Sequence, residues 1–193
     1  MNRIITISRE FGSGGRTIGK KVAEQLGIPC YDEELINRLA EASGMSEDFV
    51  KENSEYTVSG NWFANALAGR NMYGHSPQDD LWRIQSKIIY ELAEKGPCVI
   101  VGRCADYLLR GKADCLTVFI HADPEFRAKR IVEVYGEREE APLKRVKDKD
   151  KRRKAYYQFY TDSTWGDAEN YHIALDSGVL GIDTCVDLIK RLY

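Results

Sequence analysis

The chain has 193 residues, of which 43% are hydrophobic and 30% charged, and its formal net charge is -2 at pH 7. This length is typical of one domain with a sizeable buried core, and the composition is that of an ordinary globular protein. The near-neutral charge excludes a general nucleic-acid binder that relies on a basic field over the whole molecule.

The cysteines and the apolar runs bear on the compartment. The five cysteines are odd in number and form no Cys-x-x-Cys pair, so we expect reduced thiols. No Cys or His pair has the spacing of a zinc site. The apolar run at residues 4–7 is too short for a signal peptide, and no apolar stretch has the length of a membrane span. We therefore expect a soluble, cytoplasmic protein that is not bound to a membrane.

The N-terminal residues have the pattern of a strand, a glycine-rich loop and a helix. Residues 3–8 form a β-branched run that suits a buried strand. Three glycines follow, at Gly12, Gly14 and Gly15. An apolar helix face then extends from Ile18 to Leu26, and Gly27 is placed to end that helix.

Strand and helix patterns alternate along the rest of the chain. Further strands are predicted at residues 29–31, 98–101, 116–121 and 172–175. Helices are predicted at residues 81–95, 124–135 and 184–192. Asp123 and Pro124 have the residue types of a helix N-cap and first helical position. The alternation predicts an α/β fold with a doubly wound parallel sheet and helices on both faces.

Two segments go beyond a minimal core of sheet and helices. Residues 33–80 begin with a helical pattern closed by Gly44 and end in a Gly-, Asn- and Ser-rich stretch, which we interpret as a partly irregular insert. Residues 137–155 are dense in charge, and residues 144–154 hold eight basic residues and two aspartates. A basic run of this kind is often only a solvated helix face, but it could also neutralise phosphates.

The glycine-rich loop is the strongest chemical signal. A helix N-terminus presents unpaired N–H groups and partial positive charge, and glycines let a phosphate approach that backbone closely. The predicted phosphate-binding residues are Gly12, Ser13, Gly14, Gly15, Arg16 and Thr17. The strict pattern G-x-x-x-x-G-K-[ST] is not met, because Arg9 holds its first glycine position and Gly15 its lysine position. We hypothesise that Arg16 bridges the donor phosphates from the side in place of the lysine.

Short motifs along the chain resemble the cytidylate-kinase-like proteins, in order. They are ITISREFGSGGRTIGKKVAEQLG, Tyr31-Asp32 followed by Arg38, VIVGRCAD with Gly102-Arg103 and Asp106, VFIHADPEFRAKR, the lid residues Asp150, Arg152 and Arg153, and LDSGVLGID at 175–183. These matches cover nearly the whole chain except residues 45–80 or so.

The resemblance implies a P-loop kinase fold with a five-stranded parallel sheet in one domain. The core would comprise about residues 1–31, 81–136 and 156–193, with an acceptor-binding insert at about 32–80 and a lid at about 137–155. It also implies ATP-dependent phosphorylation of a small acceptor, with CMP or dCMP as the first choice.

The resemblance and the chemistry of phosphoryl transfer together assign roles to residues. The acceptor would be held by Asp32, Arg38, Arg103 and Asp106. Arg16 and the loop amides would hold the donor phosphates, and Arg152 and Arg153 would stabilise the transferring group. Asp150 would orient one of the lid arginines or face the ribose. Magnesium is implied by the reaction, with Thr17 or Ser13 as the hydroxyl ligand; no acidic ligand is identified, although Asp32 is a candidate.

Three alternatives remain open. The first is a kinase of the same fold with another small acceptor, because the insert departs from a typical cytidylate kinase. The second is a nucleotide-binding sensor without catalysis, because the lysine is missing. The third is a nucleic-acid-binding protein that uses residues 144–154, although we expect no nucleic-acid partner. The sequence leaves the oligomeric state open.

Overall fold

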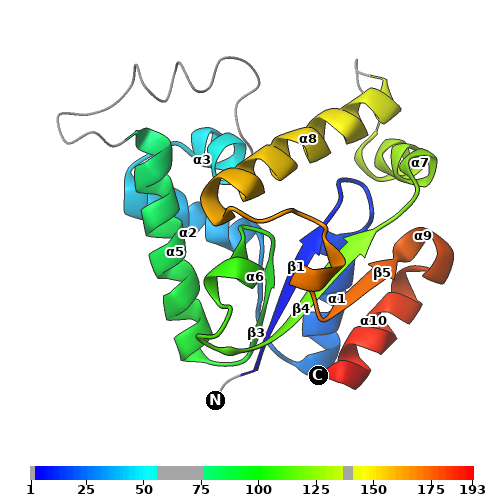
Figure 1. The fold of residues 1–193 in the computed structure, drawn as a ribbon, viewed down its shortest axis with the longest axis horizontal. Helices are drawn as coiled ribbons and strands as arrows, with labels where there is room; N and C mark the ends of the chain where they lie inside the picture. The colour runs from blue at the N-terminus through cyan, green and yellow to red at the C-terminus, as the bar shows by residue number, and fades with distance from the viewer. Residues whose placement is uncertain (1–2, 56–75, 137–140) are drawn as a thin grey trace.

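The computed structural model describes residues 3–55, 76–136 and 141–193. Its centre is a sheet of five strands in the order β2-β3-β1-β4-β5, and every neighbouring pair is parallel (Figure 1). The strands are β1 (Arg3–Arg9), β2 (Cys30–Tyr31), β3 (Cys98–Val101), β4 (Asp114–His121) and β5 (Ile173–Asp176). This arrangement confirms the predicted parallel α/β sheet.

The sheet is covered on both faces, as its apolar strands require. Ile4 of β1 packs with α2 (Glu33–Ser43), α5 (Pro77–Lys95) and α6 (Ala105–Leu108). Ile5 and Ile7 belong to a separate core cluster with α1 (Gly15–Leu26) and α10 (Ile182–Leu192). All three isoleucines are fully buried. Because successive strand residues point to opposite faces, one short apolar run anchors both helical layers.

Local capping signals set the ends of several helices. Gly27 and Gly44 end α1 and α2 in the left-handed conformation, and Asp123 caps α7 (Pro124–Tyr135), as predicted. Helix α5 begins four residues before the predicted start at 81, because Ser76 and Asp79 form a capping box. The shorter elements are α3 (Glu47–Asn53), η1 (Ala168–Asn170) and α9 (Ser177–Leu180).

Helix α8 (Pro142–Thr161) lies across the carboxyl ends of the strands (Figure 1). The charged stretch predicted as a lid therefore forms, from residue 142 onward, the first part of a continuous helix. One face of α8 is buried against the body and carries Arg145, Val146, Asp150, Arg153, Tyr156, Tyr157 and Thr161. Residues 137–140 of the predicted lid, and residues 56–75 of the predicted insert, lie outside the described residues. The division into core, insert and lid stays a prediction.

None of the helices within residues 3–55, 76–136 and 141–193 is both long enough and apolar enough to cross a bilayer.

Candidate phosphate-binding site

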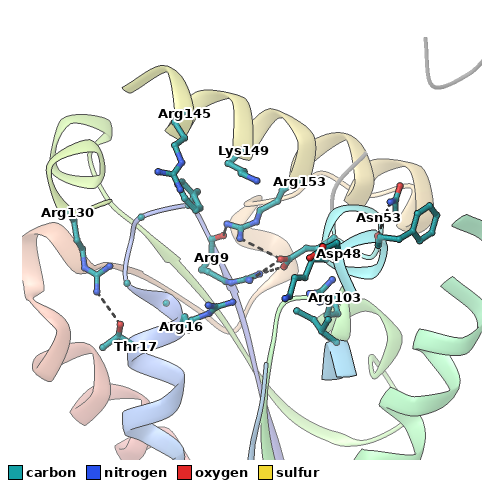
Figure 2. Close-up of a pocket in the computed structure, with 18 residues that line it drawn as sticks. Arg9, Arg16, Thr17, Asp48, Asn53, Arg103, Arg130, Arg145, Lys149 and Arg153 are labelled. Atoms are coloured by element: carbon teal, nitrogen blue, oxygen red, sulfur yellow. Dashed lines mark hydrogen bonds and ion pairs between the residues drawn. The ribbon is translucent and has the colours of Figure 1, made fainter. Parts of the chain in front are cut away.

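A cleft of about 760 Å³ lies at the carboxyl ends of the strands, between the glycine-rich loop and α8 (Figure 2). This edge of a parallel sheet is where open α/β folds bind their ligands. The basic side chains that line the cleft are Arg9, Arg16, Lys51, Arg103, Arg130, Arg145, Lys149 and Arg153. The acidic ones are Asp48 and Glu55. Such an excess of cations suits a ligand with several negative charges.

The glycine-rich loop is built for close approach to its backbone. Gly12 and Gly14 have φ of 82° and 85°, a conformation that favours glycine. A side chain at Gly12 would also lie 2.8 Å from Cγ2 of Ile131. The hydroxyl of Ser13 is buried beneath the loop and donates to the carbonyl of Glu10 at 2.9 Å. The loop and the start of α1 thus line the cleft, and their contacts with a phosphate stay a prediction.

Gly15 occupies the position of the missing lysine, and the stem of Arg9 lies against it. A Cβ at Gly15 would overlap the Cβ of Arg9 and lie 2.8 Å from its Cγ. Arg9 is the last residue of β1, and only 6% of it is exposed. A lysine at position 15 therefore cannot coexist with Arg9 in this position.

Arg9 ends in a buried cluster of charges around Glu55. Its two terminal nitrogens bind the two carboxylate oxygens of Glu55, with Nη2 3.0 Å from Oε2. Nη2 of Arg153 lies 3.5 Å from the same Oε2. Burial alone would raise the pKa of Glu55, but the charges of Arg9, Arg153 and Arg103 outweigh it and hold that pKa far below its ordinary value. Glu55 is therefore an ionised carboxylate inside a cationic site.

Arg103 enters the cleft from the turn after β3. Gly102, Arg103 and Cys104 all have positive φ, which for the latter two is an uncommon, strained backbone conformation. Arg103 is 5% exposed, and its Nη1 donates to the hydroxyl of Ser54. The carbonyl of Arg103 accepts from Nε2 of Gln85 at 3.2 Å. Arg103 thus lines the cleft, and its predicted contact with the acceptor stays a prediction.

Helix α8 is tied to the glycine-rich loop at two points. Asp150 accepts from the backbone amide of Phe11 at 2.8 Å and from Nη1 of Arg127 at 2.5 Å. Nη1 of Arg153 donates to the carbonyl of Arg9 at 3.1 Å. Asp150 therefore positions the loop and α8 relative to each other, and its predicted contacts with a lid arginine or the ribose stay predictions.

Arg16 and Asp32, predicted for donor and acceptor, are joined to each other. Nε of Arg16 lies 2.5 Å from Oδ2 of Asp32, and its Nη1 lies 3.0 Å from Oε1 of Glu33. Arg16 still lines the cleft, whereas Asp32 is not among its lining residues. The ligand contacts predicted for both residues stay predictions.

Besides Asp32, five other predicted residues do not line the cleft: Ser13, Arg38, Asp106, Asp150 and Arg152. Arg38 is bound to Glu34 one helical turn away, with Nη2 2.6 Å from Oε1, and its guanidinium lies over the ring of Tyr31. Asp106 is buried below the cleft. The roles predicted for Arg38, Asp106 and Arg152 in binding or transfer stay predictions.

The buried carboxyl of Asp106 joins β1 to α8. It accepts from the hydroxyl of Ser8 at 3.1 Å and from that of Tyr157 at 2.6 Å. Burial raises the pKa of Asp106, and these two hydrogen bonds offset part of that rise.

Thr17 is the predicted hydroxyl ligand for magnesium. Thr17 lines the cleft, and its Oγ1 accepts from Nη2 of Arg130 at 3.1 Å. Within the described ranges, no group of three or more His, Cys, Asp or Glu side chains is arranged to hold a metal. Mg²⁺ commonly keeps several waters and binds substrate phosphates with few protein ligands. The role of Thr17 as a magnesium ligand stays a prediction, because in this structure its hydroxyl is bound by a guanidinium.

Sequence reasoning missed several cleft residues. Arg130 lies in the PEFRAKR segment that was matched only as a helix, and Lys51 and Glu55 fall in the unmatched insert. One sequence feature could have identified Arg9: an arginine occupies the position where the phosphate-loop pattern has its first glycine.

The five-stranded parallel sheet, with a glycine-rich loop between β1 and α1, defines a P-loop kinase fold. A gluconokinase from Sinorhizobium meliloti has this fold, with a TM-score of 0.54 and 16% identity over 99% of this chain and 93% of that chain. The model of the cytidylate kinase-like family matches residues 4–179, and the chain belongs to that family.

Two relatives match over nearly their full length. A cytidylate kinase from Archaeoglobus fulgidus is 32% identical over 97% of this chain and 92% of the relative. The crystal structure of an uncharacterized protein from Eubacterium ventriosum is similar with a TM-score of 0.73 and 33% identity, over 98% of this chain and 96% of that one.

Proposed function

We propose that this protein transfers the terminal phosphoryl group of ATP to a nucleoside monophosphate, with CMP or dCMP as the preferred acceptor. Family membership supports the class of reaction, and the archaeal relative named cytidylate kinase supports the acceptor. The observation that carries the proposal is the cleft itself. The glycine-rich loop forms one wall, and Arg103 and Arg153 approach from other elements, so two phosphate groups can be neutralised together.

The reaction needs no covalent intermediate on the protein. An oxygen of the acceptor phosphate attacks the γ-phosphorus of ATP, the bond to the β,γ-bridging oxygen breaks, and ADP leaves. The protein contributes position and charge. The loop amides hold the donor, Arg103 faces the acceptor phosphate, and Arg153 on α8 neutralises charge on the transferring group. Magnesium bound by Thr17 and the donor would draw charge from the phosphate oxygens.

A second candidate is a kinase of the same fold with a different small acceptor. The position of Arg38 favours it, because that side chain is held by Glu34 and lies outside the residues that line the cleft. A kinase that grips the acceptor phosphate through Arg103 alone would select less strictly for a nucleotide.

The test is a screen for ADP formation with ATP, magnesium and a panel of nucleoside monophosphates and small alcohols. We expect turnover with CMP or dCMP, and CDP or dCDP as product by chromatography. Turnover only with a non-nucleotide acceptor would replace the first candidate by the second. Tight ATP binding without turnover on any acceptor would refute both and leave a nucleotide sensor.

A further inference from the structure

The residue sizes at positions 9 and 15 are reversed relative to the usual phosphate loop. The usual pattern has a glycine at the first position and a lysine after the last glycine. Here the first position holds Arg9 and the lysine position holds Gly15. The Arg9 stem fills the space that a side chain at Gly15 would need. A cation still reaches this part of the cleft, but it comes from the end of β1.

The guanidinium of Arg9 lies between the two walls of the cleft. Its stem lies against Gly15 of the loop, and its Cζ is 3.0 Å from the point where a Cβ on Gly102 would lie. Gly102 directly precedes Arg103, the residue proposed to face the acceptor phosphate. The Arg9 fork is therefore placed between the loop that would hold the donor and the turn that would hold the acceptor (Figure 2).

Arg16, the cation that the sequence suggested, has a different position. It is bound to Asp32 and Glu33, and its side chain is 39% exposed, against 8% for Arg9. An exposed arginine paired with two carboxylates interacts more weakly with a ligand than a buried one, because water screens it.

The Glu55 carboxylate marks where an anion binds in this cluster. A carboxylate and a phosphate take the same two-pronged contact from a guanidinium. One carboxylate with a single negative charge lies among Arg9, Arg103 and Arg153, so the cluster keeps excess positive charge. A phosphate group with more charge would neutralise it further.

From this geometry we propose that Arg9 replaces the loop lysine as the cation that binds the terminal phosphates of ATP. We also propose that Glu55 holds the Arg9 fork until the phosphate takes its place. The inference rests on the proposed function in one respect, the choice of ATP as the ligand.

The first experiment measures ATP affinity by calorimetry in two variants that both lack the Glu55 carboxylate and differ only at Arg9. Glu55→Gln is compared with the double variant Glu55→Gln/Arg9→Gln. We expect ATP to bind to Glu55→Gln at least as tightly as to the wild type, and at least tenfold more weakly to the double variant. Adenosine, measured as a competitor of ATP, should bind both variants within twofold. The exposed Arg83 on α5 gives the control Arg83→Gln, whose ATP affinity should equal that of the wild type.

The second experiment exchanges the two positions. Arg9→Gly alone should weaken ATP binding at least tenfold, and Arg9→Gly combined with Gly15→Lys should bring it within about fivefold of the wild type. Circular dichroism confirms that each variant is folded. Equal ATP affinity in Glu55→Gln and its double variant, or no recovery on adding the lysine, would overturn the proposal.

These measurements separate the inference from the proposed function. If the wild type phosphorylates no acceptor and the ATP affinities change as stated, the proposed function fails and the role of Arg9 stands. If the wild type is an active kinase, and both Arg9→Gly and Glu55→Gln/Arg9→Gln bind ATP as tightly as the wild type, the inference fails and the proposed function stands.

Discussion

Replacing Asp150 by Asn tests whether this residue ties α8 to the glycine-rich loop. Asp150 is 7% exposed and accepts from Nη1 of Arg127 and the amide of Phe11. Asn keeps an oxygen that can accept from the amide, but it removes the negative charge beside Arg127. The variant therefore isolates the ionic part of the contact.

The size of the effect follows from what Arg127 retains. Removing one partner of a buried ion pair typically costs about 3–5 kcal/mol. Arg127 keeps Glu10, with Oε2 3.3 Å from Nε, and the carbonyls of Ala122 and Phe11 at 2.8 and 3.1 Å. We therefore expect a loss of about 2 kcal/mol in the free energy of unfolding.

Urea unfolding measures this loss, and the same helix supplies a matched control. With a slope near 2 kcal/mol/M, the midpoint of Asp150→Asn should fall by about 1 M at unchanged slope. Asp148 has a half-exposed carboxyl 3.7 Å from Nζ of Lys144. Asp148→Asn should therefore cost less than about 0.5 kcal/mol. Equal midpoints for the two variants would refute the argument that Asp150 joins α8 to the loop.

Further predictions concern the ligand and the core. Arg103→Ala should raise the acceptor KM, lower kcat, or both, by about 2–4 kcal/mol in total with donor affinity little changed; wild-type kinetics would remove Arg103 from the site. Gly12→Ala combines a φ of 82° with a close approach to Ile131, so it should lower the unfolding free energy by about 2 kcal/mol or more and weaken ATP binding; an unchanged midpoint would contradict this. Hydrogen exchange across 144–154 should slow when ATP and acceptor are both bound, and equal exchange would count against closure of α8. Because burial raises the Asp106 pKa, the folded state keeps a proton that the unfolded chain loses, so wild-type stability falls as pH rises from the unfolded pKa through the folded one. Asp106→Asn has no such titration, so its unfolding free energy relative to that of the wild type should be more favourable at pH 7 than at pH 4. The same difference between variant and wild type at both pH values would refute this prediction.

The fold could be predicted because its signals are local. The runs at β1 and β3 are short, apolar and bounded by turn residues, and α7 has the expected Asp123 cap. The structure differs from the predicted bounds at ends of helices and strands that are set by contacts with other residues. Strand β4 starts at Asp114 because that residue pairs with Arg3 of β1, a contact that no local pattern reveals.

The candidate site could be predicted only where a residue adjoins a recognisable motif. The loop glycines and Arg103 follow strands directly, so their places at the sheet edge could be inferred. Arg38 matched a motif spacing, but its orientation depends on Glu34 one turn earlier, and the ion pair holds it on the surface of α2. The pairing of Arg9 with Glu55 joins residues 46 positions apart, which no local sequence pattern shows.

The charge of the cleft shows why net charge alone could not reveal the ligand. The whole chain carries -2, yet the cleft is lined by eight basic and two acidic side chains. The rest of the chain therefore holds the excess of acidic residues, and the cleft concentrates positive charge where a phosphate chain would bind. Glu55 limits self-repulsion within the cluster, because a buried carboxylate lets three guanidiniums stay close together before any ligand arrives. A phosphate that displaces the Glu55 carboxylate would bind to guanidiniums that already lie close together. The rearrangement required would be the movement of the Glu55 side chain.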